Sequence, residues 1–234
     1  MKNTKTKMLC EAAIFIAMAE ILSLIKLYEF PNGGSVTLEM LPIVLFAARY
    51  GCGWGAGAGL VYGAITYLIG NKFSIDWTTI ICDYFLAFVA LGFGAGLLSR
   101  RKWSVYYGTL IGGVLRFLVH FVIGAVVWGK YMPDEFFGMT MTNPWVYSLL
   151  YNGSYMLPSI ILCVVVFALL AEEILHLCRS SGCLTPSHRS GRKKAPRRKK
   201  TVDKQRKTCI IVFVLRDIAG LCKGSTADSD SVCE

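Results

Sequence analysis

The sequence contains little charge for its length. Only 17% of its 234 residues are Asp, Glu, Lys or Arg, while 54% are hydrophobic. A soluble domain typically carries about 25% charged residues, so this composition excludes an ordinary water-soluble protein. It indicates a chain whose solvent is a lipid bilayer.

Motifs for catalysis and energy conversion are also lacking. The nine cysteines form no Cys-x-x-Cys pair and show no zinc-site spacing. The glycine-containing stretch 220–225 does not fit a phosphate-binding loop, and neither a nucleophile elbow nor a His-Glu-x-x-His motif occurs. We therefore expect no metal, no cofactor and no catalytic machinery in this chain.

The formal net charge of +10 would indicate a nucleic-acid partner if it were spread over the chain, but it is confined to one end. Residues 1–178 contain 11 Lys or Arg and 10 Asp or Glu, whereas residues 179–234 contain 14 and 5. The first part is an almost neutral membrane domain, and we expect no nucleic-acid partner. The second is a basic cytosolic tail that we expect to be disordered. It could hold anionic lipid, or be an extension or out-of-frame readthrough without a role, and we assign it no function.

Six apolar segments are long enough, or nearly so, to cross a bilayer, which takes about 17–25 residues. They are 8–27, 38–50, 53–70, 78–98, 104–130 and 145–177. The second is the weakest, because it is short and contains Glu39 and Pro42. The first lacks a clear small-residue cleavage site, so we interpret it as a retained helix. The sequence predicts an all-α membrane protein with six transmembrane helices.

The basic residues fix the predicted orientation. Lys2, Lys5, Lys7, Arg49, the 100–102 cluster and the tail all fall on one side of the six spans. The loops 28–37, 71–77 and 131–144 fall on the other side. Since Lys and Arg accumulate on the cytoplasmic side, we expect a multi-pass protein of the cell membrane with both termini in the cytoplasm.

Polar and aromatic side chains of the last three spans fall in the outer half of the bilayer, by a rise of about 1.5 Å per helical residue. They are Asp83, Tyr84, His120, Trp128, Tyr147 and Asn152. Ionisable groups within a span are costly and mark functional sites. Their convergence indicates a pocket for a polar, cationic small molecule, over which the loop residues Tyr28 and Phe30 could close.

The aromatic residues and the histidine also have simpler interpretations. Tyr84, Trp128 and Tyr147 could belong to the aromatic belt at the membrane surface. His120 could merely be hydrogen-bonded to a neighbouring residue. Their clustering with polar groups favours binding, because aromatic faces attract cations and stack on planar heterocycles.

The carboxylates leave alternatives open. Asp83 could stabilise a helix N-terminus, although Asp76 is better placed for that. We expect few protein partners for Asp83, so a cationic ligand would supply its counter-charge. Arg116 could pair with Glu39 or with Asp83. Asn152 offers two donors and an acceptor, enough to recognise the edge of a heterocycle.

Small residues recur at helical spacing on two spans. Ala13 and Ala17 form a small-xxx-small stripe that lets another helix approach closely, either from a partner or from within the chain. A glycine series occurs on the third span, at positions 55, 57, 59 and 63. For the glycines we favour packing within the molecule.

Four stretches, in order and with compatible spacing, resemble the thiamine-specific S component of energy-coupling factor (ECF) transporters. They are 34–43 (GSVTLEMLPI), 83–88 (DYFLAF), 120–121 with 128–129, and 145–153. The resemblance runs from about residue 8 to 177. It implies a six-helix S-component bundle that captures thiamine outside the cell. It also implies that the protein functions together with a transmembrane T component and two cytosolic ATPases.

The resemblance also implies roles for individual residues. By the resemblance, the residues that contact the ligand are Asp83, Tyr84, His120, Trp128, Tyr147 and Asn152. Docking to the T component falls on Ala13 and Ala17. One departure is that the family often has Glu where this chain has Asp83, so the shorter side chain could reach the ligand through a water or a shifted helix.

Two other functions compete with thiamine binding. The same fold could bind a different vitamin or a thiamine precursor. Alternatively, Asp83 and His120 could serve as acid and base in an intramembrane enzyme. An enzyme would need a nucleophile or a cofactor site beside them, which the sequence lacks.

Overall fold

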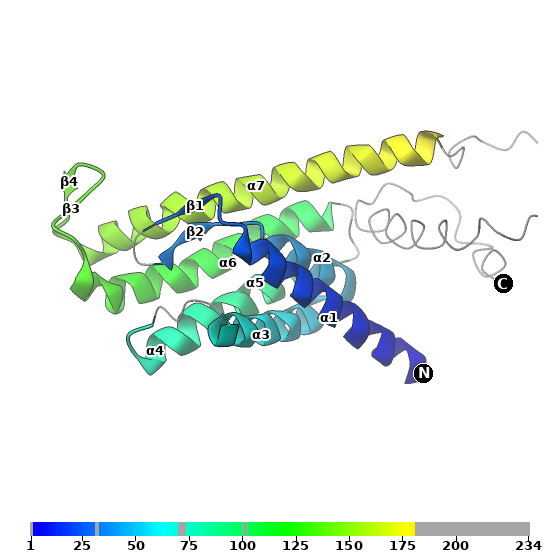
Figure 1. Ribbon diagram of the computed structural model, residues 1–234, viewed down its shortest axis with the longest axis horizontal. Helices are drawn as coiled ribbons and strands as arrows, with labels where there is room; N and C mark the ends of the chain where they lie inside the picture. The colour runs from blue at the N-terminus through cyan, green and yellow to red at the C-terminus, as the bar shows by residue number, and fades with distance from the viewer. Residues whose placement is uncertain (1, 31–32, 70–73, 100, 102, 181–234) are drawn as a thin grey trace, which may run out of the picture.

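The computed structural model describes residues 2–180 except 31–32, 70–73, 100 and 102. Within these residues, helical segments gather into one bundle, with short hairpins at one end (Figure 1). The bundle segments are α1 (Lys2–Leu24), α2 (Met40–Tyr50), α3 (Cys52–Ile69), the continuous α4–η2–α5 (Trp77–Thr79, Ile80–Leu86, Ala87–Gly96), α6 (Ser104–Val126) and α7 (Pro144–Ser180). The connections contain β1 (Tyr28–Glu29) paired with β2 (Ser35–Val36), η3 (Trp128–Tyr131), and β3 (Glu135–Phe136) paired with β4 (Met139–Thr140).

The predicted all-α membrane fold with six helical segments is confirmed. Among the described residues, α3, α4–η2–α5, α6 and α7 are each long and apolar enough to cross a membrane. Helix α1 has the length but carries charged residues, including Glu11 and Glu20. Helix α2 has only 11 residues. After α1 the chain turns back on itself, and β1 and β2 pair there as an antiparallel hairpin.

Helix α2, the weakest of the predicted spans, lies in the centre of the bundle. Its residues from Met40 to Ala48 are all buried, and it packs against α1, α3, α5 and α6. A helix that is apolar all round belongs in such a core. Because other helices surround it, α2 does not need the length of a helix that faces lipid. Its N-terminus carries Glu39 toward the interior of the protein.

The glycines of α3 allow two backbones to touch. A Cβ atom at Gly55, Gly59 or Gly63 would overlap the carbonyl oxygen of Gly92, Phe88 or Tyr84, respectively. The preference for packing within the molecule is therefore confirmed at these three positions. Gly57 is different, since a Cβ there would meet no atom within 4 Å. This close contact between α3 and η2–α5 fixes the segment that carries Asp83.

The fourth segment departs from the uniform α-helix expected over 78–98. Residues Ile80–Leu86 form a π-helical stretch, η2, between α4 and α5. Such wider turns are rare and occur frequently at functional sites. Both Asp83 and Tyr84 lie in η2, so the irregular turn sets the direction of two candidate site residues. The sequence carried no signal for it, because the stretch is as apolar as an ordinary helix.

The last two helices differ from the predicted spans at their ends. Helix α6 ends at Val126, so Trp128 lies in the 3-10 turn η3 and not in the helix. Helix α7 has 37 residues, which correspond to about 55 Å. It is longer than a hydrocarbon core of about 30 Å. The predicted basic tail lies outside the described residues, apart from the last two residues of α7.

Candidate functional site

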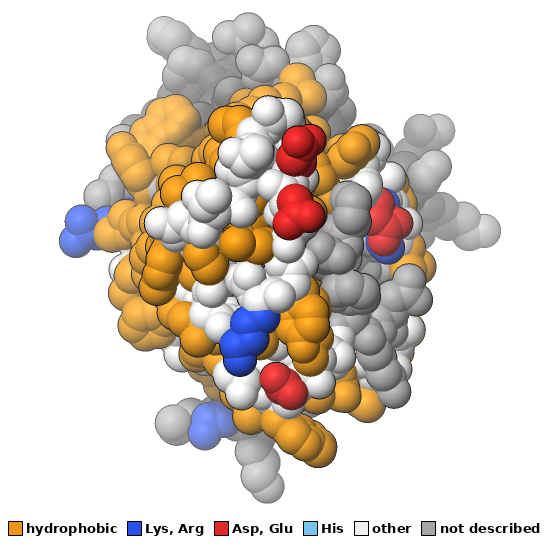
Figure 2. Space-filling model, turned by 90° about the vertical axis from the view of Figure 1, so that its left-hand side faces the viewer, with side chains coloured by type: hydrophobic (Ala, Val, Ile, Leu, Met, Phe, Trp, Pro, Cys, Tyr) orange, Lys and Arg blue, Asp and Glu red, His pale blue; other side chains and the backbone are white. Residues whose placement is uncertain are grey.

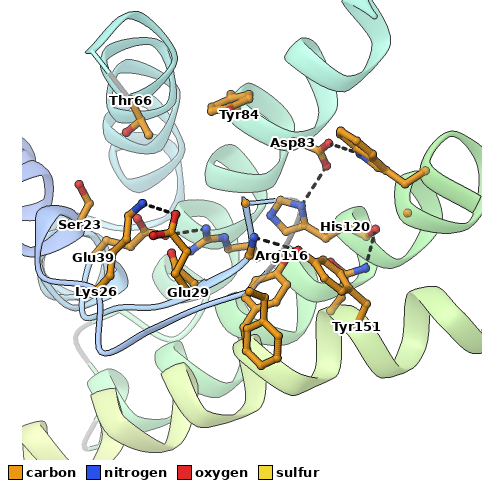
Figure 3. Close-up of a pocket in the computed structure, with 18 of the residues that line it drawn as sticks. Ser23, Lys26, Glu29, Glu39, Thr66, Asp83, Tyr84, Arg116, His120 and Tyr151 are labelled. Atoms are coloured by element: carbon orange, nitrogen blue, oxygen red, sulfur yellow. Dashed lines mark hydrogen bonds and ion pairs between the residues drawn. The ribbon is translucent and has the colours of Figure 1, made fainter. Parts of the chain in front are cut away.

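A cavity of about 600 Å³ lies among α1, the β1–β2 hairpin, α3, η2, α6, η3 and α7 (Figure 3). This volume is in the usual range for small-molecule sites. All six residues predicted from the sequence line it: Asp83, Tyr84, His120, Trp128, Tyr147 and Asn152. The end of the bundle that holds the hairpins carries acidic and basic side chains between hydrophobic ones (Figure 2). The predicted convergence of three distant segments on one cavity is therefore confirmed, while the role of each residue toward a ligand stays a prediction.

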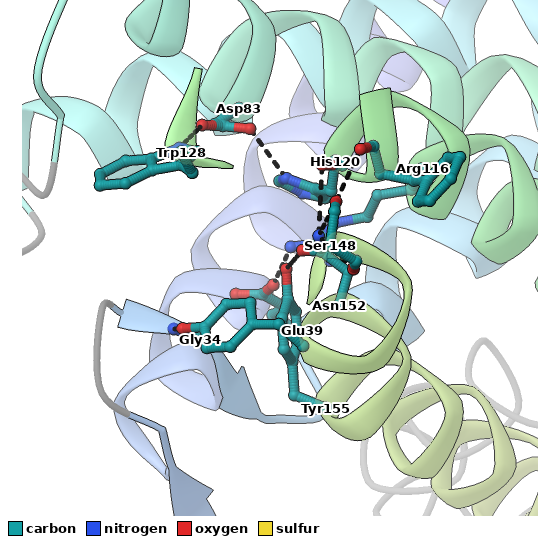
Figure 4. A network of polar contacts seen from close by, with 11 residues as sticks. Gly34, Glu39, Asp83, Arg116, His120, Trp128, Ser148, Asn152 and Tyr155 are labelled. Carbon is teal, nitrogen blue, oxygen red and sulfur yellow. Dashed lines mark hydrogen bonds and ion pairs between the residues drawn. The ribbon is translucent and has the colours of Figure 1, made fainter. Parts of the chain in front are cut away.

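Asp83 is held from two sides by protein groups. Its Oδ1 lies 3.0 Å from Nδ1 of His120, and its Oδ2 accepts a hydrogen bond from Nε1 of Trp128 at 3.2 Å (Figure 4). The expectation that Asp83 has few protein partners is thus wrong. Both partners come from segments distant in the sequence, since His120 lies on α6 and Trp128 in the turn η3. The two contacts orient the carboxylate.

Only one of the two ring nitrogens of His120 has a hydrogen-bond partner among the described residues. While Nδ1 contacts Asp83, Nε2 is buried and has no hydrogen-bond partner among the described residues. Buried polar atoms are rarely left unpaired in folded proteins. With Nδ1 donating to Asp83, Nε2 of a neutral ring is an acceptor whose capacity the described residues leave unused.

A row of tyrosines on α7 forms an aromatic wall of the cavity. Tyr147, Tyr151 and Tyr155 recur every four residues, and adjacent rings lie 5.7 and 5.8 Å apart between centroids. Tyr147 is only 3% exposed. On the opposite side, Tyr84 packs edge-on against Tyr67 with centroids 5.4 Å apart. Aromatic faces on both sides suit a flat, cationic or heterocyclic molecule.

Most of the hydrogen bonds that the Asn152 side chain can form are made within the protein. Its Nδ2 donates to the backbone oxygens of Ser148 and His120, at 3.0 and 3.3 Å, and lies 3.1 Å from Oγ of Ser148. Its Oδ1 accepts a hydrogen bond from Tyr155 at 2.7 Å. Asn152 therefore braces α6 against α7, and one lone pair of Oδ1 remains for a ligand.

The loop after α1 closes one side of the cavity. The backbone N–H of Gly34 donates to the hydroxyl of Tyr151 at 3.0 Å, and a Cβ at Gly34 would overlap the ring of Tyr155. Only glycine allows this close approach of the loop to α7. Phe30 lines the cavity as expected. Tyr28 does not belong to the lining; it is exposed and packs edge-on against Phe30.

Arg116 pairs with Glu39, which decides between the two partners that the sequence left open. Its Nη2 donates to Oε1 of Glu39 at 2.7 Å, and the hydroxyl of Tyr62 donates to the other carboxylate oxygen at 3.0 Å. The guanidinium carbon lies 4.2 Å from the ring centroid of Phe88. Arg116 is 8% exposed, so this ion pair is part of the interior wall of the cavity.

Sequence reasoning missed several residues of the cavity wall. They include Glu20, Ser23, Lys26, Glu29, Thr66, Ser148, Tyr151 and Tyr155. The spacing of the α7 tyrosines at four-residue intervals was a signal that could have found Tyr151 and Tyr155. Glu20 is an ionisable residue within the predicted span 8–27, which was itself a signal. Its place on the wall depends on how α1 crosses α3, where Thr66 donates to it at 3.2 Å.

Ala13 and Ala17 lie on the outer surface of α1 and are exposed. Their neighbours Ile14 and Met18 are exposed as well, at 60% and 40%. The small-residue stripe is therefore not used for packing within the described bundle. It leaves a face of α1 on which another helix can approach closely.

A membrane-spanning helical bundle that encloses a cavity lined by aromatic rings and by an oriented carboxylate is typical of a membrane protein that binds a small molecule. The sequence identifies which one: residues 9–179 match the family described as thiamine transporter protein (Thia_YuaJ), and the chain belongs to this family.

Known relatives support this assignment. The thiamine transporter ThiT of Bacillus subtilis (strain 168) is 36% identical over 186 residues, covering 74% of this chain and 94% of that protein. ThiT of Lacticaseibacillus paracasei is 30% identical over 175 residues, covering 68% and 84%. A solved structure of ThiT from Listeria monocytogenes superposes with a TM-score of 0.61 at 25% identity, covering 71% of this chain and 94% of that one.

Proposed function

We propose that this protein is the thiamine-binding S component of an ECF-type vitamin uptake transporter. Its membership of the thiamine transporter family supports this function. So does the position of Asp83, a carboxylate held at the wall of a cavity within a membrane bundle. That carboxylate is the observation on which the proposal depends, because thiamine carries a permanent positive charge.

The cavity offers each part of thiamine a matching group. The thiazolium cation attracts the Asp83 carboxylate and the faces of aromatic rings. The aminopyrimidine is a flat heterocycle that can stack on Trp128 or on the tyrosines of α7 and hydrogen-bond to His120 and Asn152. Tyr84 and Tyr147 complete the aromatic walls. These six residues are the proposed thiamine contacts.

Transport also needs partners and a direction. We propose that the exposed Ala13 and Ala17 dock against the transmembrane T component, which two cytosolic ATPases drive. The positive residues near the ends of α1 and α2 favour a cytoplasmic location of both termini. The cavity, at the hairpin end of the bundle, would then open to the outside, where the vitamin is captured.

A titration of the purified protein with a panel of vitamins tests this function. We expect thiamine to give a saturable calorimetric signal, and riboflavin and biotin to give none. A response to another vitamin, or to a precursor that contains only one of the two thiamine rings, with none to thiamine, would assign the same fold to a different ligand. The absence of binding to any of them would overturn the proposal.

A further inference from the structure

Most of the charged side chains of the cavity wall form ion pairs with one another. The wall contains four carboxylates and two basic side chains, which are Glu20, Glu29, Glu39, Asp83, Lys26 and Arg116. Lys26 pairs with Glu29 at 2.6 Å and Arg116 pairs with Glu39 at 2.7 Å. Among the described residues, Asp83 and Glu20 are left without a Lys or Arg at ion-pair distance.

The two ion pairs differ in burial. The Lys26–Glu29 side chains are 36% and 52% exposed, so water screens them and the pair has little effect on a ligand. The Arg116–Glu39 side chains are only 10% and 14% exposed. A guanidinium at this depth acts on a bound molecule with little screening. Glu39 is thus the group that cancels a buried positive charge in the cavity wall.

Arg116 lies on the same face of α6 as the histidine that holds Asp83. Arg116 and His120 are four residues apart, about one turn, and both line the cavity. Figure 4 shows the Arg116 side chain directed toward Glu39 and His120 directed toward Asp83. Glu39 therefore holds the guanidinium away from the carboxylate that faces the ligand. Without Glu39, Arg116 would be an uncompensated cation in a site for a cation.

We propose that Glu39 determines the charge selectivity of the cavity by neutralising Arg116, so that the site prefers cationic thiamine over its phosphorylated, anionic forms. The proposal rests on the proposed thiamine-binding function. Glu39 acts through Arg116 and is a positioning residue. Once Glu39 no longer cancels its charge, the Arg116 guanidinium at the cavity wall is a cation that attracts a phosphate group.

Glu39→Gln tests the proposal, because Gln keeps the shape and can still accept a hydrogen bond from Arg116. A unit charge that acts over about 10 Å at an effective dielectric constant of about 20 changes a dissociation constant roughly tenfold. We expect thiamine to bind about tenfold more weakly to Glu39→Gln and thiamine monophosphate to bind no more weakly than to wild type. The ratio of the two constants should shift by about tenfold or more.

The double variant Glu39→Gln/Arg116→Gln should return that ratio to within about threefold of wild type, since both charges are then gone. Glu11→Gln is the matched control. Glu11 also faces an arginine, Arg49, at 3.6 Å, but it lies outside the cavity, so the ratio should not change. Equal weakening of both ligands in Glu39→Gln would show a merely structural role and overturn the proposal.

A variant that does not fold is detected by thermal unfolding in detergent. If Glu39→Gln does not fold, the single variant Arg116→Gln replaces it as the test. Because this variant removes the positive charge, its preference for thiamine over thiamine monophosphate should be at least that of the wild type. A lower preference would overturn the proposal. Failure of the wild-type protein to bind thiamine would instead contradict the proposed function. Normal wild-type binding with an unshifted ratio in Glu39→Gln contradicts only the role of Glu39.

Discussion

Nδ1 of His120 lies 3.0 Å from Oδ1 of Asp83, and this contact joins the C-terminal half of α6 to the π-helical turn η2. The two side chains are mostly buried, at 12% and 16% exposure. A carboxylate in such a place is costly unless polar groups surround it. The contact therefore keeps Asp83 in position before a ligand arrives, which lowers the cost of ordering the site on binding.

Replacing Trp128 should separate its two roles. The indole donates to Asp83 and is proposed to stack on thiamine, whereas Phe keeps the stacking face and loses the donor. We expect thiamine to quench the tryptophan fluorescence of the wild type. In Trp128→Phe most of the quenching should disappear and affinity should fall about tenfold, as for a hydrogen bond to a charged group. Trp54→Phe, on α3 outside the cavity, is the control that should keep both. Full quenching in Trp128→Phe would place the ligand elsewhere.

The contact between α3 and the Asp83 segment predicts a stability effect. Gly59→Ala places a Cβ against the carbonyl oxygen of Phe88 and should destabilise the protein by about 1–3 kcal/mol, as overpacking does. Gly57→Ala meets open space and should have no such cost. The comparison of their unfolding midpoints in detergent checks this. If the two variants unfold at the same temperature, the helices are not in backbone contact.

The face of α1 can be tested apart from binding. Ala13→Trp should abolish thiamine uptake by cells, because a large side chain keeps the proposed T-component helix away, while the purified variant still binds thiamine. Leu169→Trp, at an exposed apolar position on α7, is the control that should retain uptake. Normal uptake by Ala13→Trp would mean that the docking surface lies elsewhere.

Much of the fold and site could be predicted from the sequence because hydropathy and small-residue patterns are local. The six segments and the convergence of Asp83, His120 and Tyr147 follow from span length and depth, and the glycine contacts follow from the spacing of small residues on the third span. The irregular turns could not be predicted in this way. The π-helical stretch η2 and the turn η3 depend on tertiary contacts, and they determine that Trp128 reaches Asp83.

Local sequence patterns also could not predict which charged residues form ion pairs. Arg116 is 77 residues from Glu39, and the sequence offered Asp83 as an equal alternative. The choice depends on α2 being buried at the centre of the bundle, where its N-terminus brings Glu39 to α6. The position of Glu20 on the cavity wall likewise depends on how α1 crosses α3.

The most direct measurement is a calorimetric titration of Asp83→Asn with thiamine beside Asp76→Asn. Asn at position 83 keeps the shape and can still contact His120, but it removes the charge that the thiazolium requires. Loss of one partner of a desolvated charge pair costs about 2–5 kcal/mol, so affinity should fall roughly 30-fold or more. Asp76 is exposed at the start of α4, where Asn caps a helix equally well, so that variant should bind as the wild type does. Wild-type affinity in Asp83→Asn, or equal losses in both variants, would contradict the claim that Asp83 holds the cation.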